Sequence, residues 1–98
     1  MGNSHDSKHP IYPKVRVEVF VHYKLTVNYP EKTQILDKLS GLGYDLVTNV
    51  DGGKYFLLGF MDVTLRKARA TAREIANKML ANPVTETFRI GKVEATTP

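Results

Sequence analysis

Residues 14 to 23, KVRVEVFVHY, alternate strictly between two kinds of side chain, and this alternation is the strongest constraint on the fold. One side of the alternation carries only β-branched residues, Val15, Val17, Val19 and Val21. The other side is mostly polar and carries Arg16, Glu18, Phe20 and His22. A period of two in β-branched residues is typical of a strand with one buried face. The sequence therefore predicts such a strand over residues 14–23.

A helix is expected next. Asn28 is a candidate N-cap, Pro30 suits the first turn, and Glu31 stands three residues after the cap, where its carboxylate can bond back to it. The apolar residues that follow have the spacing of one helical face: Ile35, Leu36, Leu39 and Leu42. Gly41 and Gly43 favour the left-handed backbone that ends a helix, so about three turns are predicted.

Two apolar and aromatic runs follow this helix. Residues 44–50 and 54–60 are separated by Asp51, Gly52 and Gly53, a composition suited to positive φ angles in a tight hairpin. We expect the two runs to be antiparallel neighbours. The second run places Phe56, Leu58 and Phe60 on one face and Tyr55, Leu57 and Gly59 on the other. Because both faces are largely apolar, this strand is expected to be central or to meet another subunit.

A second helix is predicted from a cap at Asp62 or Thr64. Its apolar stripe consists of Leu65, Ala68, Ala72, Ile75, Ala76 and Met79, and Arg66, Arg69 and Arg73 form a basic stripe. Asn82 and Pro83 are expected to stop the helix, since proline cannot continue it. A last strand is predicted over residues 85–93, followed by a loose tail at 94–98.

The predicted order is strand, helix, strand, strand, helix, strand, which is typical of an α+β, ferredoxin-like βαββαβ sandwich. Four antiparallel strands would carry two helices on one face, within a single domain at residues 14–93. Residues 1–13, with Pro10 and Pro13, are expected to be a flexible leader or a vector-derived remnant. The open sheet face would expose Tyr55 and Leu57, and we expect self-association to cover this face or the sheet edges.

Composition excludes several classes of function. The 98 residues include no cysteine, so disulfides and thiolate sites are absent, and a cytoplasmic location is expected. No apolar stretch is long enough for a membrane span or a signal peptide. His5 and His9 have no third ligand at a metal spacing, and His22 has no visible partner for catalysis. With no phosphate loop, acidic pair or nucleophile motif, we expect no catalytic, cofactor-binding or metal-binding residue.

The formal net charge of +4 is concentrated in residues 65–80, which hold five basic residues and one glutamate. A sequence pI near 9.4 suggests nucleic-acid binding. However, one basic helix face on an otherwise neutral domain is more often a solvated surface or a contact for an acidic partner. We therefore expect no nucleic-acid partner and no membrane partner.

Several segments, taken in order, carry a family resemblance over residues 12–93. They are the opening strand VRVEVFVHYK, LGYDLVTNV at 42–50, GKYF at 53–56 and, above all, KMLANPVTETFRI at 78–90. The chain resembles the PurS subunit of phosphoribosylformylglycinamidine (FGAM) synthase. The resemblance implies a non-catalytic accessory subunit of de novo purine biosynthesis, in a cytoplasmic complex with a glutaminase subunit and a large synthetase subunit.

The resemblance also implies an activity for the complex as a whole. It uses ATP and Mg, and it converts formylglycinamide ribonucleotide and glutamine to formylglycinamidine ribonucleotide and glutamate, a ligase reaction. The small subunit, a homodimer or a dimer of dimers, would bridge the other two subunits and aid ammonia channelling between them. It would bind no cofactor itself. We hypothesise that the predicted hairpin and its strand, the turn at Asn82 and Pro83, and the basic stripe contact partners. The residues of this interface are Lys54, Tyr55, Leu57, Arg66, Arg69, Arg73, Asn82 and Pro83.

Each of these residues also has a purely structural interpretation. Gly52 and Gly53 suit a turn, Pro83 stops a helix, and the arginines suit a solvated surface. Two other functions stay open. Small βαββαβ domains that pair side by side often bind small molecules as regulatory modules, which a thermal-shift screen would detect. A nucleic-acid binder would lose affinity steeply with salt.

Overall fold

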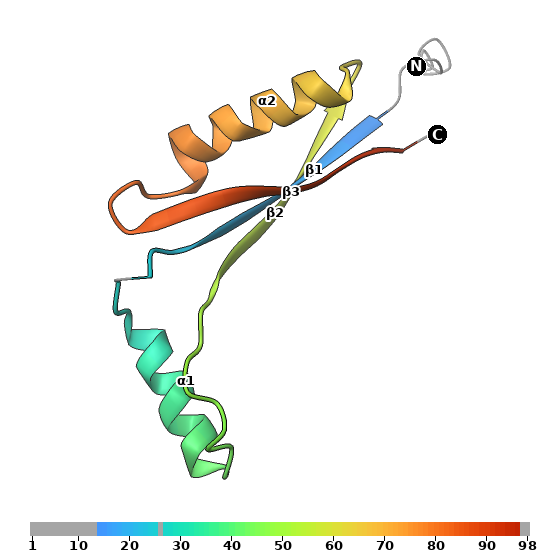
Figure 1. Cartoon of the computed structure of the whole chain (residues 1–98). Helices are drawn as coiled ribbons and strands as arrows, with labels where there is room; N and C mark the ends of the chain where they lie inside the picture. The colour runs from blue at the N-terminus through green and yellow to red at the C-terminus, as the bar shows by residue number, and fades with distance from the viewer. Residues whose placement is uncertain (1–13, 26, 97–98) are drawn as a thin grey trace, which may run out of the picture.

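The computed structural model describes residues 14–25 and 27–96, which form two helices and three strands (Figure 1). Strands β1 (Lys14–Tyr23), β2 (Gly53–Met61) and β3 (Glu86–Thr96) make an antiparallel sheet in the order β2-β1-β3. Helix α1 (Pro30–Gly41) lies between β1 and β2. Helix α2 (Leu65–Ile75) continues into a single wider π turn, η2 (Ala76–Leu80), before β3. The predicted first strand is confirmed over its full length.

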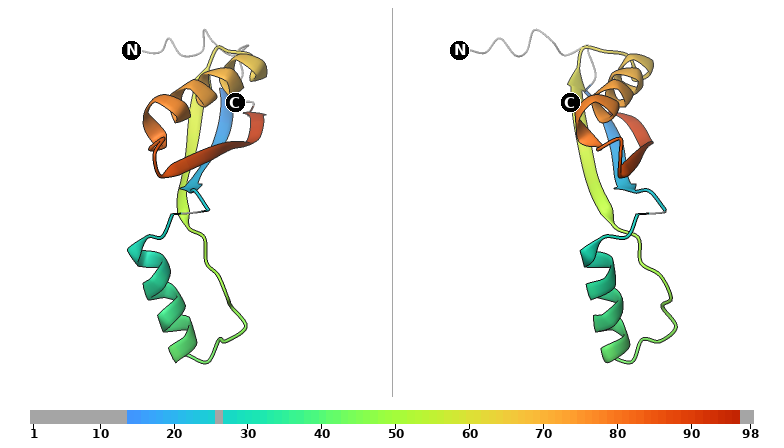
Figure 2. Two further views of the ribbon diagram at one scale, coloured as in Figure 1. Left: turned by 60° about the vertical axis from the view of Figure 1, so that its left-hand side comes forward. Right: turned by 90° about the vertical axis from the view of Figure 1, so that its left-hand side faces the viewer.

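The core lies between α2 and one face of the sheet (Figure 2). The four alternating valines of β1 are completely buried against three alanines of the second helix, and the set is Val15, Val17, Val19, Val21, Ala68, Ala72 and Ala76. Alanine at these positions lets the helix backbone approach the sheet closely. Leu65 and Met79, expected in the same stripe, are largely exposed. Helix α2 packs on β1 and β3, and β2 lies to one side of it.

The helix ends follow the predicted chemistry in part. Thr64 is the N-cap of α2, and its side chain accepts a hydrogen bond from the Lys67 amide at 3.0 Å. The N-cap of α1 is Tyr29, which makes no side-chain cap bond, so the prediction of Asn28 as the cap is wrong. Pro30 does occupy the first turn of α1, and Gly43 follows the helix with φ +90°.

In the described residues the predicted fourth strand and hairpin do not form and the sheet has three strands, so the four-stranded prediction is wrong. Residues 44–50 form a turn and an irregular segment, and β2 pairs with β1 instead, with Gly53 opposite His22. Neither Gly52 nor Gly53 has a positive φ angle. Asn and Asp, which are frequent in residues 44–51, are depleted in strands, and Leu46 and Val47 break the alternation. Strand β2 is therefore an edge strand, and β1 is the central one.

The second expected helix layer is also not formed, because α1 does not lie on the sheet. Helix α1 and the segment after it extend beyond the end of the sheet (Figures 1 and 2), and we call residues 30–51 the arm. No residue of α1 is buried. The radius of gyration is 18.9 Å, whereas a compact domain of this length has one of roughly 13 Å. A ferredoxin-like sandwich with both helices on one face is therefore not formed within one chain.

The two ends of the predicted domain have different outcomes. Residues 94–96, expected to be loose, belong to β3, and Thr96 pairs with Lys14. The predicted leader at residues 1–13, including His5 and His9, and residues 97–98 lie outside the described residues.

Candidate partner-binding surface

The face of the sheet opposite α2 is open, as predicted. Tyr55 and Leu57 of β2 are 52% and 49% exposed on this face. They lie beside the non-valine side chains of β1, because the register pairs Glu18 with Leu57 and Phe20 with Tyr55. An antiparallel sheet with one solvated face is ordinarily polar there. The apolar content of this face therefore marks it as a candidate binding surface.

A β-bulge in β3 organises the centre of this face. Val17 pairs with Val93 and Val19 with Ile90, so that Gly91 and Lys92 both lie opposite Glu18. The Glu18 carboxylate accepts a hydrogen bond from the Lys92 amide and another from the Tyr55 hydroxyl, each at 2.9 Å. Both bonds lower the pKa of Glu18, and the bond from the Lys92 amide has the larger effect. The bond between the two side chains raises the pKa of Tyr55.

An aromatic cluster lies beside this carboxylate. The Phe20 ring centre is 5.2 Å from that of Tyr55, and the Arg89 guanidinium lies 4.2 Å from the centre of the Phe20 ring. A Cβ at Gly91 would lie 2.5 Å from Cε2 of Phe20, so any larger residue there would displace this ring. The bulge glycine therefore has a packing role that sequence reasoning did not assign.

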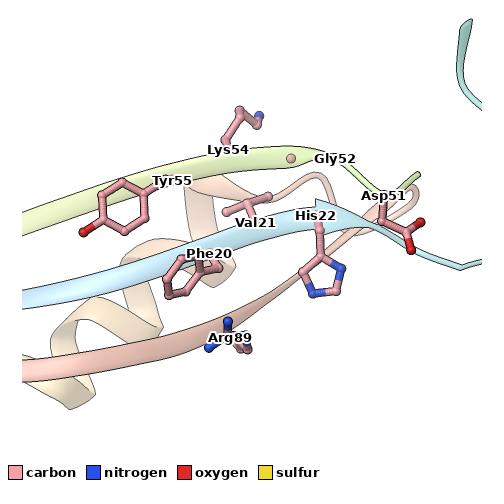
Figure 3. Close-up of a pocket in the computed structure, with 9 residues that line it drawn as sticks. Phe20, Val21, His22, Asp51, Gly52, Lys54, Tyr55 and Arg89 are labelled. Carbon is pink, nitrogen blue, oxygen red and sulfur yellow. The ribbon is translucent and has the colours of Figure 1, made fainter. Parts of the chain in front are cut away.

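A shallow cavity of about 320 Å³ opens at the arm-proximal end of this cluster (Figure 3). Phe20, Tyr55 and Arg89 lie on one side of the sheet in this view, and His22 and Asp51 lie near the end of β1. His22 Nδ1 is 3.3 Å from the carbonyl oxygen of its neighbour Tyr23. Within the described part of the chain, no group of three potential metal ligands occurs. The cavity presents side chains for binding, with no nucleophile activated by a neighbouring base.

Three of the predicted interface residues meet at one corner of the sheet. Lys54 forms an ion pair with Glu86 at 3.5 Å, and Glu86 Oε1 accepts a hydrogen bond from the Asn82 amide at 2.7 Å. The Asn82 side chain in turn accepts a bond from the Val84 amide at 2.9 Å, and Lys24 Nζ donates to the Pro83 carbonyl at 2.7 Å. Asn82 and Pro83 thus have clear structural roles in the turn between η2 and β3.

The arm joins the sheet through a tyrosine junction that sequence reasoning missed. The rings of Tyr23 and Tyr29 stack with centres 4.1 Å apart and planes at 14°. The buried Tyr29 accepts a hydrogen bond from the Gly52 amide at 2.9 Å. The ring stack and this hydrogen bond hold together the segment that enters the arm and the segment that leaves it. A cavity of about 390 Å³ lies beside the junction. The available signal was two tyrosines separated by a short link of five residues.

The basic stripe and the arm are the remaining exposed features. Arg66, Arg69 and Arg73 are exposed on α2 and form no ion pair with another described residue. Large apolar side chains are exposed along the arm, namely Ile35, Leu42, Tyr44, Leu46 and Val47. The predicted interface residues therefore lie in three separate places: the open face, the corner and α2.

Comparisons with known proteins identify a family. A family model described as PurS, phosphoribosylformylglycinamidine (FGAM) synthase, matches residues 16–94. A search of curated proteins found no match. No helix in the described residues is long and apolar enough to cross a membrane.

Solved structures give the same result. The chain is similar to PurS from Methanocaldococcus jannaschii, one of the subunits of formylglycinamide ribonucleotide amidotransferase, with 31% identity and a TM-score of 0.70 over 82% of this chain and 95% of that one. It is similar to B. subtilis PurS, with 31% identity and a TM-score of 0.69 over 82% and 98% of the two chains. A chain of PurLQS from Thermotoga maritima shares its fold, with 23% identity and a TM-score of 0.71 over 86% and 99%.

Proposed function

The chain belongs to the PurS family of FGAM synthase subunits, and on that premise we propose that it is a non-catalytic accessory subunit of this synthase in de novo purine biosynthesis. In the complex it bridges the glutaminase subunit and the large synthetase subunit and aids ammonia transfer between them. The observation that carries the proposal is the family match over residues 16–94. The PurLQS structure from Thermotoga maritima supports the association with both partners.

The surface of the chain supports a scaffold function. Apolar side chains are exposed on the open sheet face and on the arm, and both are surfaces that a partner would bury. The described residues bring together no set of groups suited to acid–base or nucleophilic catalysis. Such a chain contributes contacts to a complex, while the partners carry the catalytic residues and bind ATP and Mg.

Ammonia transfer gives a physical reason for such a scaffold. Ammonia released into water at neutral pH is mostly protonated, and the ammonium ion is not a nucleophile. A synthetase that uses ammonia therefore gains from a glutaminase held close to it and from a path sheltered from water. A subunit that fixes the distance between the two active sites meets this need without chemistry of its own.

The proposal includes self-association and a cytoplasmic location. The chain acts as a homodimer or a dimer of dimers, and its exposed apolar residues supply the surface for this. It needs neither a nucleic acid nor a membrane. A regulatory ligand-binding module of βαββαβ type has less support, because the sheet has three strands and α1 does not lie on it.

Reconstitution tests the proposal. The glutaminase and synthetase subunits from the same organism are assayed with ATP, Mg²⁺ and glutamine, with this chain present and omitted. We expect glutamine-dependent formation of formylglycinamidine ribonucleotide to require all three chains. Synthesis from a high concentration of ammonium chloride serves as the control, because it needs only the synthetase and should persist without this chain. Equal glutamine-dependent rates with and without the chain would overturn the proposal.

Assembly is the second readout. Size-exclusion chromatography with light scattering, in the presence of ATP, Mg²⁺ and glutamine, should show one complex containing all three chains. A binary complex of glutaminase and synthetase that excludes this chain would contradict the bridging role. Omitting glutamine shows whether assembly depends on turnover.

A further inference from the structure

The end of the arm contains a dipeptide with a chemistry of its own. Asp51 is followed by a glycine, whereas every other aspartate of the chain precedes a residue with a side chain. Gly52 has no Cβ to hinder the approach of its amide nitrogen to the carboxyl group of Asp51. Both residues are exposed at the arm end of the sheet (Figure 3), and the Asp51 side chain is 54% exposed. Water can therefore reach the two groups.

The amide and the carboxyl group can react with each other without a catalyst. The Gly52 nitrogen attacks Cγ of Asp51, a carbon–nitrogen bond forms, and the amide hydrogen leaves with the carboxyl hydroxyl group as water. The product is a succinimide ring. Water then opens one of the two carbon–nitrogen bonds of the ring, which gives back aspartate or gives isoaspartate, whose main chain runs through the side-chain methylene. Aspartate and isoaspartate have the same composition, so the reaction consumes no oxidant, reductant or cofactor.

Tyr29 holds the backbone on both sides of Asp51. Its hydroxyl oxygen accepts a hydrogen bond from the Gly52 amide at 2.9 Å, and the hydroxyl donates to the Val50 carbonyl at 3.5 Å. Tyr29 is only 7% exposed, and its ring is stacked on that of Tyr23. The attacking nitrogen is therefore bonded through its hydrogen to an acceptor that is itself fixed in place.

The carboxylate of Asp51 is restrained less strongly than the amide. Asn49 Nδ2 donates to Oδ2 of Asp51 at 3.1 Å, and Lys32 Nζ lies 4.0 Å from Oδ1. These contacts restrict the rotation of the carboxylate. Because they involve an exposed side chain, their contribution is small. Tyr29 is therefore the main restraint on the reaction.

An isoaspartate at residue 51 would change how the arm is attached to the sheet. Isomerisation adds one atom to the main chain immediately before β2. The first residue of β2, Gly53, lies so close to β1 that a Cβ on it would clash with the carbonyl oxygen of Val21. The strand therefore has no room to absorb the extra length, which displaces the Gly52 amide from Tyr29 instead.

From these observations we propose that the Asp51–Gly52 bond is a site of spontaneous isoaspartate formation, and that the hydrogen bonds of Tyr29 suppress the reaction in the folded chain. Succinimide formation then requires the tyrosine junction to open, so its rate follows the population of the open state. The reaction products would accumulate at the one position that ties the arm to β2. The inference concerns contacts within one chain and does not depend on the proposed function.

Peptide mapping tests the site. The purified chain is incubated for several weeks at neutral pH and digested with a protease that cleaves before aspartate but not before isoaspartate. The uncleaved fraction at Asp51 measures conversion, and cleavage at Asp37 and Asp45 is the internal control. A synthetic peptide of residues 47–56, which lacks Tyr29, gives the unrestrained rate. We expect the peptide to convert at residue 51 and the folded chain to convert at least about tenfold more slowly. No conversion in the peptide, or equal rates in peptide and chain, would overturn the inference.

Tyr29→Phe tests the restraint itself. The variant keeps the ring but loses the hydroxyl that bonds to Val50 and Gly52, and conversion should become about two- to fivefold faster. Tyr44→Phe, at an exposed tyrosine of the same arm, is the matched control and should leave the rate unchanged. Circular dichroism shows whether each variant is folded. Equal conversion rates in the folded Tyr29→Phe and Tyr44→Phe variants would overturn the inference.

Gly52→Ala tests the chemistry separately from the restraint. An alanine Cβ at this position would lie 3.4 Å from the Tyr29 hydroxyl, which is an ordinary contact, and the backbone has no positive φ angle there. The methyl group hinders the attack of the amide nitrogen, so conversion should slow in the chain and in the peptide alike. An alanine variant that converts as fast as the parent chain would show that the Gly52 amide is not the nucleophile and would overturn the inference.

Discussion

The body of the molecule, which is the sheet with α2 and η2, and the arm both carry apolar residues, yet only the body buries any of them fully. In the body, the valines of β1 are fully buried against Ala68, Ala72 and Ala76. In the arm, Ile35 and Leu42 are exposed and no residue of α1 is buried. An apolar helical stripe therefore predicts burial, but it does not say whether the covering surface is in the same chain.

The largest effect is expected from a charge placed in the body's core. Ala72→Glu puts a carboxylate where the side chain has no exposure, against the valines of β1. We expect a loss of about 4 kcal/mol or more in the free energy of unfolding, which would leave the chain largely unfolded. Urea denaturation followed by circular dichroism measures it. Ala70→Glu, on the exposed side of the same helix, is the control and should change stability by less than about 0.5 kcal/mol.

A smaller loss is expected at the start of α2. Thr64→Ala removes the side chain that accepts a hydrogen bond from the Lys67 amide. The free energy of unfolding should fall by about 1 kcal/mol, the usual cost of an N-cap. Thr71→Ala is the control, because the Thr71 hydroxyl donates to the Lys67 carbonyl within the helix and caps nothing. Equal losses in the two variants would mean that the cap contributes nothing specific.

A local effect is expected at the tyrosine junction. Tyr29→Phe keeps the ring on Tyr23 but removes the oxygen that accepts from the Gly52 amide. The local opening free energy at Gly52 should fall by about 0.5–1 kcal/mol, with β1 and α2 unaffected. Amide exchange by NMR measures it, with exposed Tyr44→Phe as the control. Faster exchange throughout the sheet would show that the junction supports the body as well as the arm.

The smallest effect is expected on the free energy of unfolding at acid pH, through Glu18 on the open face. The pKa of Glu18 is lower in the folded chain than the ordinary value of 4.5. Its contribution to stability is therefore present above that ordinary value and is lost as pH falls through the folded pKa. In the Glu18→Gln variant the free energy of unfolding, measured by urea denaturation at several pH values, should fall less steeply over this acid range. If the pH dependence is the same in the variant, the bonds to Lys92 and Tyr55 do not favour folding.

The sequence predicted the local elements of the body well. Alternation located β1 residue for residue, and Thr64, one of the two predicted caps, begins α2. The faces of β2 were also predicted correctly, with Phe56 inward and Tyr55 outward. These features depend on spacing along the chain, which a sequence displays directly.

The main failures concern contacts between distant segments. The hairpin was predicted from two glycines, but Gly53 instead lets β2 approach β1, where a Cβ would meet the carbonyl oxygen of Val21. The position of α1 depends on the stack of Tyr23 and Tyr29, which spacing does not encode. The predicted interface residues lie on the open face, at the corner and on α2, and their contact with partners stays a prediction.

The most direct test of this account is amide hydrogen exchange by mass spectrometry across a range of protein concentrations, because it follows the body and the arm in one experiment. We predict that β1 and α2 are protected at every concentration, whereas protection of the arm rises as the dimer forms. An arm as strongly protected as α2 in dilute monomer, or one that gains no protection when the dimer is populated, would contradict the account.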